Sequence, residues 1–414
     1  MRLTLPAFSG YGIELEYMIV DRATLSILPI ADKVLQRIYE TCASTPRRAE
    51  LAWSHELVLH LVELKNVEPD KDMDMLAAGF QSEIQRINDL LEPMGARLMP
   101  TAMHPWMNPR IETRIWQHEN AEIYTAYDRI FDCNRHGWAN LQSMQLNLPF
   151  ANDHEFARLH AAVRLLLPIL PALAASSPIV EGGDAGWMDF RMESYLTHQG
   201  RLPLTMGKVI PDTISSRAAY ERDILAPMYR EIVSLDARRI LQHEWLNVRG
   251  AVPRFDRNAI EIRVIDTQEC PEADLAIAAA TADILRTLYD EVNAPLPEQQ
   301  AMETDALVEI MHGCIRSAEA AVITNAEYLR LLGFPDGRCE AGELWRHLIG
   351  SIPWNQSEQR EHARLSLQVM LDHGPLARRI KRAMRAEYSK KRLVDVYKKL
   401  CDCLEAGTMF LGLD

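Results

Sequence analysis

The chain has 414 residues, of which 48% are hydrophobic and 25% are charged, an ordinary balance for a globular protein. The 45 Lys and Arg residues against 58 Asp and Glu residues give a formal net charge of −13. This negative charge argues against nucleic acid as a general partner, because phosphate contacts need surplus Lys and Arg. The composition also excludes a disordered chain and a collagen-like repeat.

The N-terminal segment lacks the uninterrupted apolar stretch of a signal peptide, and carboxylates appear early, at Glu14 and Glu16. No uncharged apolar run reaches the ~18 residues of a membrane-spanning helix, so we expect no membrane association. The seven cysteines are scattered, and none are paired at zinc-ligand spacing. This pattern favours reduced thiols and a cytoplasmic location.

The first 270 residues alternate between strand-like and helix-like stretches. Strands are predicted over 11–21, 96–103 and 141–149, and one strand or a tight hairpin over 56–68. Helices are predicted over 31–40, 71–94, 119–137 and 153–174, with a loop over 175–190. The stretches 243–253 and 259–266 flank the turn-forming residues 255–258 and therefore predict a β-hairpin.

From about Pro271 the chain is predicted to be mostly helical, with helices at about 272–291, 303–321, 340–349, 357–372 and 376–404. Many strands followed by segregated helices indicate an α+β fold with an antiparallel sheet. We therefore expect a sheet domain over residues 1–270. Residues 271–414 would form a mainly helical part packed on the same domain.

Polar side chains recur at a spacing of two in four of the predicted strands. Because side chains two apart on a strand share a face, one face of the sheet would be apolar and packed under helices. The other face would carry carboxylates, amides and an arginine. A sheet face in water would explain any single pair. Four pairs between apolar neighbours predict a lined cavity instead, and the pairs are Glu14/Glu16, Glu63/Lys65, Gln145/Asn147 and Glu261/Arg263.

Clustered carboxylates repel one another, and the four pairs contain only one lysine and one arginine as compensation. Divalent cations are the natural remaining source of positive charge, and oxygen-only ligands favour Mg²⁺ or Mn²⁺ over zinc. Mg²⁺ held by carboxylates commonly bridges to nucleotide phosphates, so the pattern points to phosphoryl transfer. Glu56 precedes Glu63 by an odd separation, so both can reach one site only if a bulge or turn intervenes.

Other motifs carry weaker signals. The chain has no Walker A loop and no GxSxG elbow, and the Gly182-Gly183 pair lacks the lysine of a phosphate-binding loop. His104 and His243 could act as general bases, although an isolated histidine is more often structural. A basic stretch near the C-terminus is typical of a solvated helix face, and alternatively could contact ATP phosphates or an anionic substrate. It comprises Arg378, Arg379, Lys381, Arg382, Arg385, Lys390, Lys391 and Arg392.

Five motifs, in order over residues 10–270, resemble the glutamate–cysteine ligase family, especially its bacterial carboxylate–amine ligase branch within the glutamine synthetase-like superfamily. GIELE at 12–16 resembles the opening G-x-E-x-E strand, and Glu56 with VEL at 62–64 resembles the following acidic pair. TAMHPW at 101–106 is similar to the family's H-P segment. AASSPIVEG at 174–182, followed by Arg191, is similar to the family's S-P loop. IEIRVID at 260–266 resembles the family's E-x-R…D strand. One position departs from the family pattern: Gln145 stands where the family strand often carries His, whereas Asn147 matches.

The resemblance implies a glutamine synthetase-like sheet that forms an active-site cavity, with a catalytic domain over 1–270. It also implies an ATP- and Mg²⁺-dependent (or Mn²⁺-dependent) carboxylate–amine ligase that forms an amide through an acyl phosphate. Arg263 would stabilise the transferring phosphoryl group, and Arg191 would contact the substrate carboxylate or the phosphate. Arg263, Gln145 and Asn147 would lie at the nucleotide. The implied metal ligands are Glu14, Glu16, Glu56, Glu63 and Glu261.

Two alternatives stay open at this point. The His-to-Gln difference would suit a non-catalytic relative that binds a nucleotide or an amino acid and regulates a partner. The superfamily's sheet also supports phosphotransferases that act on guanidino or carboxyl groups. For the ligase, the expected partners are a small carboxylate, such as an amino acid, and an amine. No nucleic acid or membrane is expected, and a homodimer stays open because similar ligases can form dimers.

Overall fold

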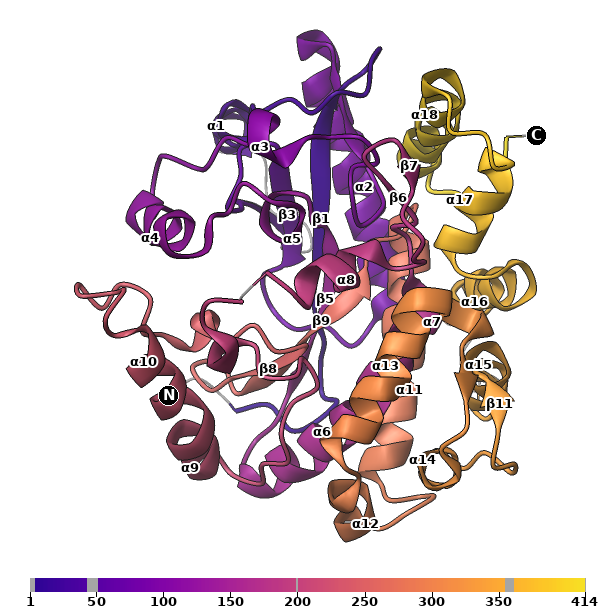
Figure 1. Cartoon of the computed structure of the whole chain (residues 1–414). Helices are drawn as coiled ribbons and strands as arrows, with labels where there is room; N and C mark the ends of the chain where they lie inside the picture. The colour runs from indigo at the N-terminus through magenta and orange to yellow at the C-terminus, as the bar shows by residue number, and fades with distance from the viewer. Residues whose placement is uncertain (1–3, 43–50, 199, 354–360, 414) are drawn as a thin grey trace.

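A seven-stranded antiparallel sheet lies at the centre of the computed structural model, which describes residues 4–42, 51–198, 200–353 and 361–413 (Figure 1). The strand order is β2-β3-β1-β5-β9-β8, and β4 pairs with the second half of β1. This architecture confirms the predicted α+β fold. The strands are β1 (Gly12–Asp21), β2 (Leu51–His55), β3 (Leu61–Asn66), β4 (Ala96–Met99), β5 (Ser143–Pro149), β8 (Ala251–Arg254) and β9 (Ala259–Asp266).

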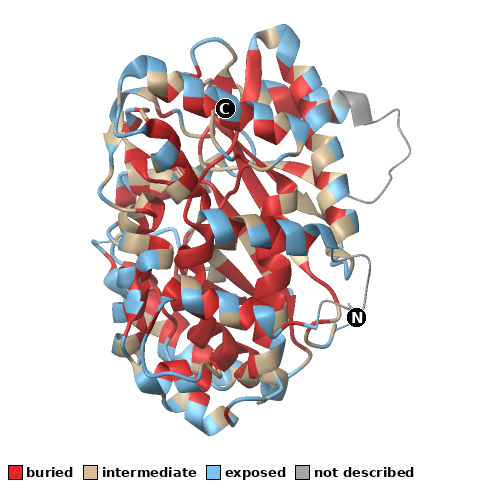
Figure 2. Cartoon of the chain, turned by 90° about the vertical axis from the view of Figure 1, so that its right-hand side faces the viewer, coloured by how far each residue is buried: buried red, intermediate tan, exposed pale blue. Residues whose placement is uncertain are grey.

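One face of the sheet is apolar, as the alternation predicts. Ile13, Leu15, Val62, Leu146 and Ile262 are almost completely buried and belong to a single large hydrophobic core. The same core contains the apolar sides of α2 (Met73–Leu91), α6 (Asp153–Leu166) and α11 (Pro271–Tyr289). Figure 2 shows this buried interior beneath an outer shell of half-buried and exposed helix faces. Burial of these side chains is the main favourable term in folding, and it leaves the opposite sheet face for polar groups.

Several predicted elements are interrupted where the backbone turns. The predicted helix 119–137 is two helices, because Asp132 takes a left-handed conformation (φ 57°) after α4. The predicted helix 153–174 continues from α6 through a 3₁₀ turn, where Pro168 and Pro171 remove backbone donors. The loop at 175–190 contains a short hairpin of two strands, each two residues long. The remaining elements up to residue 195 are α1 (Ala31–Cys42), α3 (Pro109–Glu112), α4 (Ala121–Phe131), α5 (His136–Ala139), α7 (Leu170–Ala174), β6 (Ile179–Val180), β7 (Gly183–Asp184) and α8 (Phe190–Tyr195).

Two strand predictions also need correction. The turn at 56–60 joins β3 to β2, a strand that the pattern did not predict, so the hairpin begins earlier than expected. The first strand of the 243–266 hairpin is short, because residues 244–246 form a 3₁₀ turn before β8. Between the S-P loop and this hairpin lie two further helices, α9 (Arg217–Tyr220) and α10 (Ala226–Ile232).

The described residues of the C-terminal part are mostly helical, with a small two-stranded antiparallel sheet, β10 with β11, that the sequence did not predict. The predicted helix 376–404 is two helices, because Arg385 and Ala386 both have positive φ angles (52° and 56°). The start of the predicted helix 357–372 falls outside the described residues. The division at residue 270 stays a prediction. The elements are α12 (Leu296–Ala301), α13 (Thr304–Ser317), β10 (Val322–Ile323), α14 (Ala326–Leu331), β11 (Cys339–Glu340), α15 (Ala341–Gly350), α16 (Glu361–His373), α17 (Leu376–Met384) and α18 (Lys390–Ala406).

Within the described residues, one helical stretch is long and apolar enough to cross a membrane, Asp153–Ala174. It is a core segment, because 94% of its most apolar window is buried inside the protein. The six cysteines whose surroundings the structure describes are buried and unpaired, in agreement with the expected reduced thiols.

Candidate active site

The four polar pairs predicted from the sequence lie on four adjacent strands, β3, β1, β5 and β9. Glu14 is opposite Lys65 on one side and Gln145 on the other, and Glu16 is opposite Glu63. Across the next pair of strands, Asn147 is opposite Glu261. Because directly opposed residues share a face, the register brings the pairs together on the side of the sheet away from the core.

This polar face forms the floor of a cavity of about 610 Å³. Every residue of the four pairs except Asn147 lines it. Asn147 acts through Glu14, since its amide nitrogen donates to Glu14 Oε1 at 3.2 Å. The cavity is large enough for a nucleotide-sized ligand.

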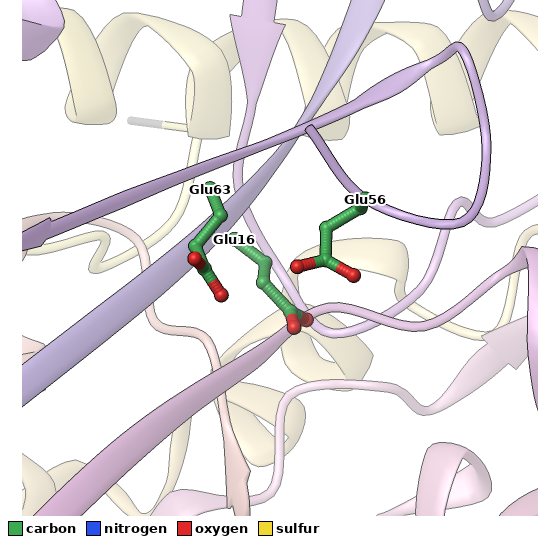
Figure 3. Close-up of side chains that lie close together, drawn as sticks. All are labelled: Glu16, Glu56 and Glu63. Atoms are coloured by element: carbon green, nitrogen blue, oxygen red, sulfur yellow. The ribbon is translucent and has the colours of Figure 1, made fainter. Parts of the chain in front are cut away.

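Three carboxylates converge within the cavity. Glu16 comes from β1, Glu63 from β3 and Glu56 from the turn that joins β2 to β3, and Figure 3 shows their carboxylates directed toward a common space. One oxygen from each lies within 4.8 Å of the others. The intervening turn resolves the odd separation of Glu56 and Glu63, as the sequence required. Glu14 and Glu261 line the same cavity but lie outside this three-carboxylate group.

Neighbouring donors orient these carboxylates. Glu16 accepts hydrogen bonds from the backbone nitrogen of Ser143 at 2.7 Å and from Gln145 Nε2 at 3.1 Å. Glu63 accepts from Lys65 Nζ at 2.5 Å and from Ser54 Oγ at 2.8 Å. Gln145 therefore acts here as a donor to Glu16, a role that a neutral amide can fill.

The electrostatics divide the carboxylates into two sets. Burial and the charge of Glu63 raise the pKa of Glu16 to about 7. Burial, followed by the charges of neighbouring glutamates, also raises the pKa values of Glu14 and Glu56 well above the ordinary range. Burial alone would raise the pKa of Glu63, but Lys65 outweighs it and the pKa falls below its ordinary value.

Glu261 belongs to the second set. It is buried, yet Arg263 and Arg254 lower its pKa below the ordinary value. Arg254 Nη1 donates to Glu261 Oε2 at 2.9 Å, and Arg263 forms a close ion pair with Glu261 Oε1. Glu261 therefore already has two cationic partners, whereas Glu14, Glu16 and Glu56 share an excess of negative charge.

The two predicted arginines occupy different settings. Arg263 lines the cavity beside Glu261. Arg191 reaches the cavity from α8, and its Nε donates to the fully buried Asp266 at 2.5 Å. Its Nη2 atom is buried and has no hydrogen-bond partner among the described residues. That orphaned donor leaves Arg191 able to bind an anion in the cavity.

Several cavity residues were not predicted. Arg254 ends β8 and Arg257 lies in the turn of the β8–β9 hairpin, and their position beside the E-x-R strand was the one available signal. An aromatic wall is formed by Tyr127 with Trp138 and Trp245, whose ring centroids lie 5.3 and 5.8 Å from that of Tyr127. The spacing of these aromatic residues does not distinguish a cavity wall from a core, so the sequence carried no usable signal for them.

The two histidines considered as general bases do not line the cavity. His104 is a buried structural residue: Nε2 lies 2.8 Å from the carbonyl oxygen of Leu25, and Nδ1 accepts from the backbone nitrogen of Met107 at 3.0 Å. Burial lowers the pKa of His104 to about 3. His243 stacks on Trp245. The structural interpretation is confirmed for His104.

The basic C-terminal stretch also lies away from the cavity, so its predicted alternative contact with phosphates is not supported. Figure 1 shows α17 and α18 beside the β6–β7 hairpin. Lys381 pairs with Asp184 of that hairpin at 2.7 Å, and Lys390 lies 3.5 Å from the ring centroid of Trp106. These contacts hold the C-terminal helices on the rest of the protein.

The residues present fit a divalent cation. All donors in the three-carboxylate group are oxygens, as Mg²⁺ and Mn²⁺ prefer. Burial, followed by the charges of neighbouring glutamates, raises the pKa values of Glu16 and Glu56, and a bound cation would offset both effects. Lys65 forms its ion pair with Glu63.

Comparison with known proteins supports the same interpretation. The model of the family described as Glutamate-cysteine ligase family 2 (GCS2) matches residues 11–395. The chain belongs to this family. The membership confirms the resemblance drawn from the five motifs, and it places the chain among carboxylate–amine ligase-like proteins with a glutamine synthetase-like fold.

Individual relatives of this GCS2 protein are distant. A protein of Archaeoglobus fulgidus described as "Uncharacterized protein" is 31% identical over 401 residues, which cover 97% of this chain and 100% of that one. The "Putative glutamate--cysteine ligase 2-1" of Rubrobacter xylanophilus is 24% identical over 294 residues, 69% of each chain. The structure of a glutamate–cysteine ligase from Francisella tularensis in complex with AMP superposes with a TM-score of 0.60 at 13% identity, covering 95% of this chain and 88% of that one. This last likeness shows the fold.

Proposed function

We propose that this GCS2 protein is an ATP-dependent carboxylate–amine ligase that forms an amide bond through an acyl-phosphate intermediate. The observation that carries the proposal is the cavity floor, where Glu16, Glu56 and Glu63 converge beside the arginines Arg191 and Arg263. Oxygen ligands for a cation next to two guanidinium groups are the parts that phosphoryl transfer requires. The AMP bound to the Francisella tularensis relative supports a nucleotide in the equivalent fold.

The reaction has two steps. A carboxylate oxygen of the acid substrate attacks the γ-phosphorus of ATP, and the bond between that phosphorus and the leaving oxygen of ADP breaks. The amine nitrogen then attacks the acyl carbon, the carbon–oxygen bond to phosphate breaks, and the amine loses a proton. Arg263 and Arg191 stabilise the negative charge that moves with the phosphoryl group, because preorganised guanidinium groups favour charge that develops in the transition state.

Glu16, Glu56 and Glu63 would hold the divalent cation, Mg²⁺ or Mn²⁺, and Glu14 lies in the same cavity. Glu261 instead pairs with Arg254 and Arg263. When bound, the cation neutralises charge on the nucleotide phosphates. Within this assignment Gln145 orients Glu16 through its amide and Asn147 orients Glu14. We also propose a cytoplasmic location, because that compartment supplies ATP and keeps thiols reduced.

The test is ADP release by the purified protein with ATP and Mg²⁺. Pools of amino acids and small carboxylates are supplied with and without pooled amines, and dividing the pools identifies the substrates. Glu16→Gln and Glu63→Gln should each reduce ADP formation by at least about 100-fold, because even the loss of a residue that only supports a metal ligand costs ~10–100-fold. Thermal unfolding checks that each variant is folded.

Glu327→Gln is the matched control, since Glu327 is exposed on α14 and does not line the cavity. It should leave the rate unchanged. Unchanged ADP release in both cavity variants would contradict the proposal. ATP binding without turnover under every pool would favour the regulatory alternative, and a stable phosphorylated product without an amide would favour a phosphotransferase.

A further inference from the structure

Asp266, at the end of β9, forms an ion pair with the guanidinium of Arg191. The Arg191–Asp266 pair is 2.5 Å long, and the side chains are 2% and 0% exposed. Asp266 does not line the cavity, whereas Arg191 does. Asp266 therefore stands behind Arg191 as seen from the cavity.

A bulge in the sheet places Asp266 there. Glu261 and Arg263 share the cavity face of β9, and by simple alternation Asp266 would point to the apolar core. The pairing of β5 with β9 shifts between Met144 and Leu146, so that one residue of β5 faces two of β9. After the shift, Asp266 is opposite Ser143, a residue of the cavity face. A β-bulge re-aims side chains in this way.

Asp266 is itself held by donors of the S-P loop and α8. Its Oδ2 accepts from the backbone nitrogen of Ser176 at 2.8 Å and from Ser177 Oγ at 3.0 Å, and its Oδ1 accepts from Arg191. Arg191 Nη1 donates to the carbonyl oxygen of Arg263 at 3.3 Å. With Nε and Nη1 engaged, Nη2 is the donor that remains for a ligand.

A second buried carboxyl, Asp189, lies beside this group. It is fully buried, begins α8, and its Oδ1 accepts from the backbone nitrogen of Met192 at 2.8 Å. Burial and the charge of Asp266 raise its pKa well above the ordinary value. Of the two aspartates, Asp266 is the one that forms an ion pair with Arg191.

We propose that Asp266 is a positioning residue of the active site: it fixes the guanidinium of Arg191 so that Arg191 meets the anion in the cavity, while Asp189 serves only as the helix cap of α8. The proposal rests on the ligase function proposed above for the role of Arg191. It assigns different roles to two buried aspartates that are both close to Arg191, and this difference makes it testable.

The experiment compares Asp266→Asn with Asp189→Asn. Asparagine keeps the size of each side chain, and it is as good a helix cap as aspartate. Asp266→Asn should lower kcat for ADP formation by about 100-fold with little change in the KM for the amine, since small misplacement of a catalytic group costs ~10²-fold. Asp189→Asn should retain activity within about 3-fold, because asparagine keeps the cap hydrogen bond to the backbone nitrogen of Met192.

A double-mutant cycle with Arg191→Lys tests whether Asp266 acts through Arg191. If it does, Asp266→Asn adds little to the loss caused by Arg191→Lys alone. Should Asp266→Asn fail to fold, Ser177→Ala replaces it, because that variant removes one hydrogen bond to Asp266 and should lower kcat more mildly. Equal losses in the Asp266 and Asp189 variants, or additive losses in the cycle, would overturn the proposal.

A measurement without substrates separates this proposal from the proposed function. The Nε–H signal of Arg191 in a ¹⁵N NMR spectrum is assigned by its absence in Arg191→Lys. It should be protected from solvent exchange in the wild type and in Asp189→Asn, and lose that protection in Asp266→Asn. If the wild type releases no ADP with any pool, the ligase function fails, and this exchange pattern still decides whether Asp266 holds Arg191. A protected signal in Asp266→Asn would refute the positioning role.

Discussion

At the scale of single residues, chemistry in this protein follows from surroundings more than from residue type. Glu16 and Glu261 are both buried carboxylates on the same sheet face, yet the pKa of Glu16 rises to about 7 while that of Glu261 falls. The difference arises because Glu16 faces Glu63, whereas Glu261 is bracketed by Arg254 and Arg263. The same principle applies to the buried histidines, which the fold keeps neutral.

His160 offers a direct test of this effect. It is 1% exposed on α6, its Nε2 has no hydrogen-bond partner among the described residues, and burial lowers its pKa to about 3. As the pH falls below the unfolded value of ~6.5, the unfolded chain binds a proton that the folded protein does not, so stability is lost on acidification. Between pH 7 and pH 5 this contributes a loss of about 2 kcal/mol in the free energy of unfolding.

His160→Phe removes the titrating group within an aromatic cluster that contains Phe156 and Tyr220. The variant should therefore lose about 2 kcal/mol less than the wild type between pH 7 and pH 5, whatever its stability at pH 7. Urea unfolding at a series of pH values measures this difference. His154→Phe, on the exposed side of the same helix, should leave the pH dependence unchanged. Parallel curves for wild type and His160→Phe would rule the effect out.

At the scale of elements, the positions where regular structure stops were harder to predict than the elements themselves. The bulge between β5 and β9 and the reversals at Asp132 and Arg385 depend on backbone angles that residue patterns specify weakly. Gly95 is an exception, because it ends the turn before β4 with φ 69°, a conformation that glycine adopts without strain.

Gly95 and Gly350 form a matched pair for testing this reasoning. A Cβ added at either position meets no atom within 4 Å, but only Gly95 has a positive φ. Gly95→Ala should destabilise the protein by about 1 kcal/mol, the cost of a left-handed conformation for an L-residue. Gly350→Ala, in the last turn of α15, should stabilise it by ~0.5–1 kcal/mol, because alanine loses less backbone entropy in a helix. Chemical unfolding measures both, and equal effects of the same sign would contradict the argument.

At the scale of the whole molecule, a buried ion pair joins the C-terminal helices to the end of the central sheet. Arg379 of α17 pairs with Glu269, three residues beyond β9, and both side chains are 0% exposed. Arg379 Nη1 also donates to the carbonyl oxygen of Phe410 at 2.7 Å, and the backbone nitrogen of Phe410 donates to Glu269 at 3.1 Å. The chain's last segment, α17 and the sheet therefore meet at one point.

Arg379→Met should lower the free energy of unfolding by about 3–5 kcal/mol, because it leaves Glu269 as an uncompensated buried charge. The double variant Arg379→Met with Glu269→Leu should recover much of that loss. Arg378→Met is the control: Arg378 pairs with Glu319 in a half-exposed position, so its loss should cost at most ~1 kcal/mol. Guanidinium chloride unfolding followed by circular dichroism compares them. A double variant no more stable than Arg379→Met would refute the ion-pair explanation.

Much of the fold and the site was open to prediction from local patterns. The alternation of Glu14, Leu15 and Glu16 assigned faces correctly, since the period of a strand is independent of its partners. The family motifs located all nine predicted site residues, of which eight line the cavity and Asn147 donates a hydrogen bond to Glu14. The aromatic wall around Tyr127 was missed, because a cavity wall and a core have the same composition along the chain. Arg254 was missed because its pairing with Glu261 depends on the β8–β9 pairing.

The sequence by itself determined which residues alternate on each strand and where apolar faces must be buried, and it predicted a cation beside the excess of carboxylates. These are properties of neighbours in the chain. Only the tertiary structure decided that β3, β1, β5 and β9 lie side by side, that Glu56 turns into the group of Glu16 and Glu63, and that Asp266 stands behind Arg191. Those contacts join residues that are far apart in the chain, such as Glu16 and Gln145, which are 129 positions apart. Strand order, a bulge and a turn together bring such residues into contact.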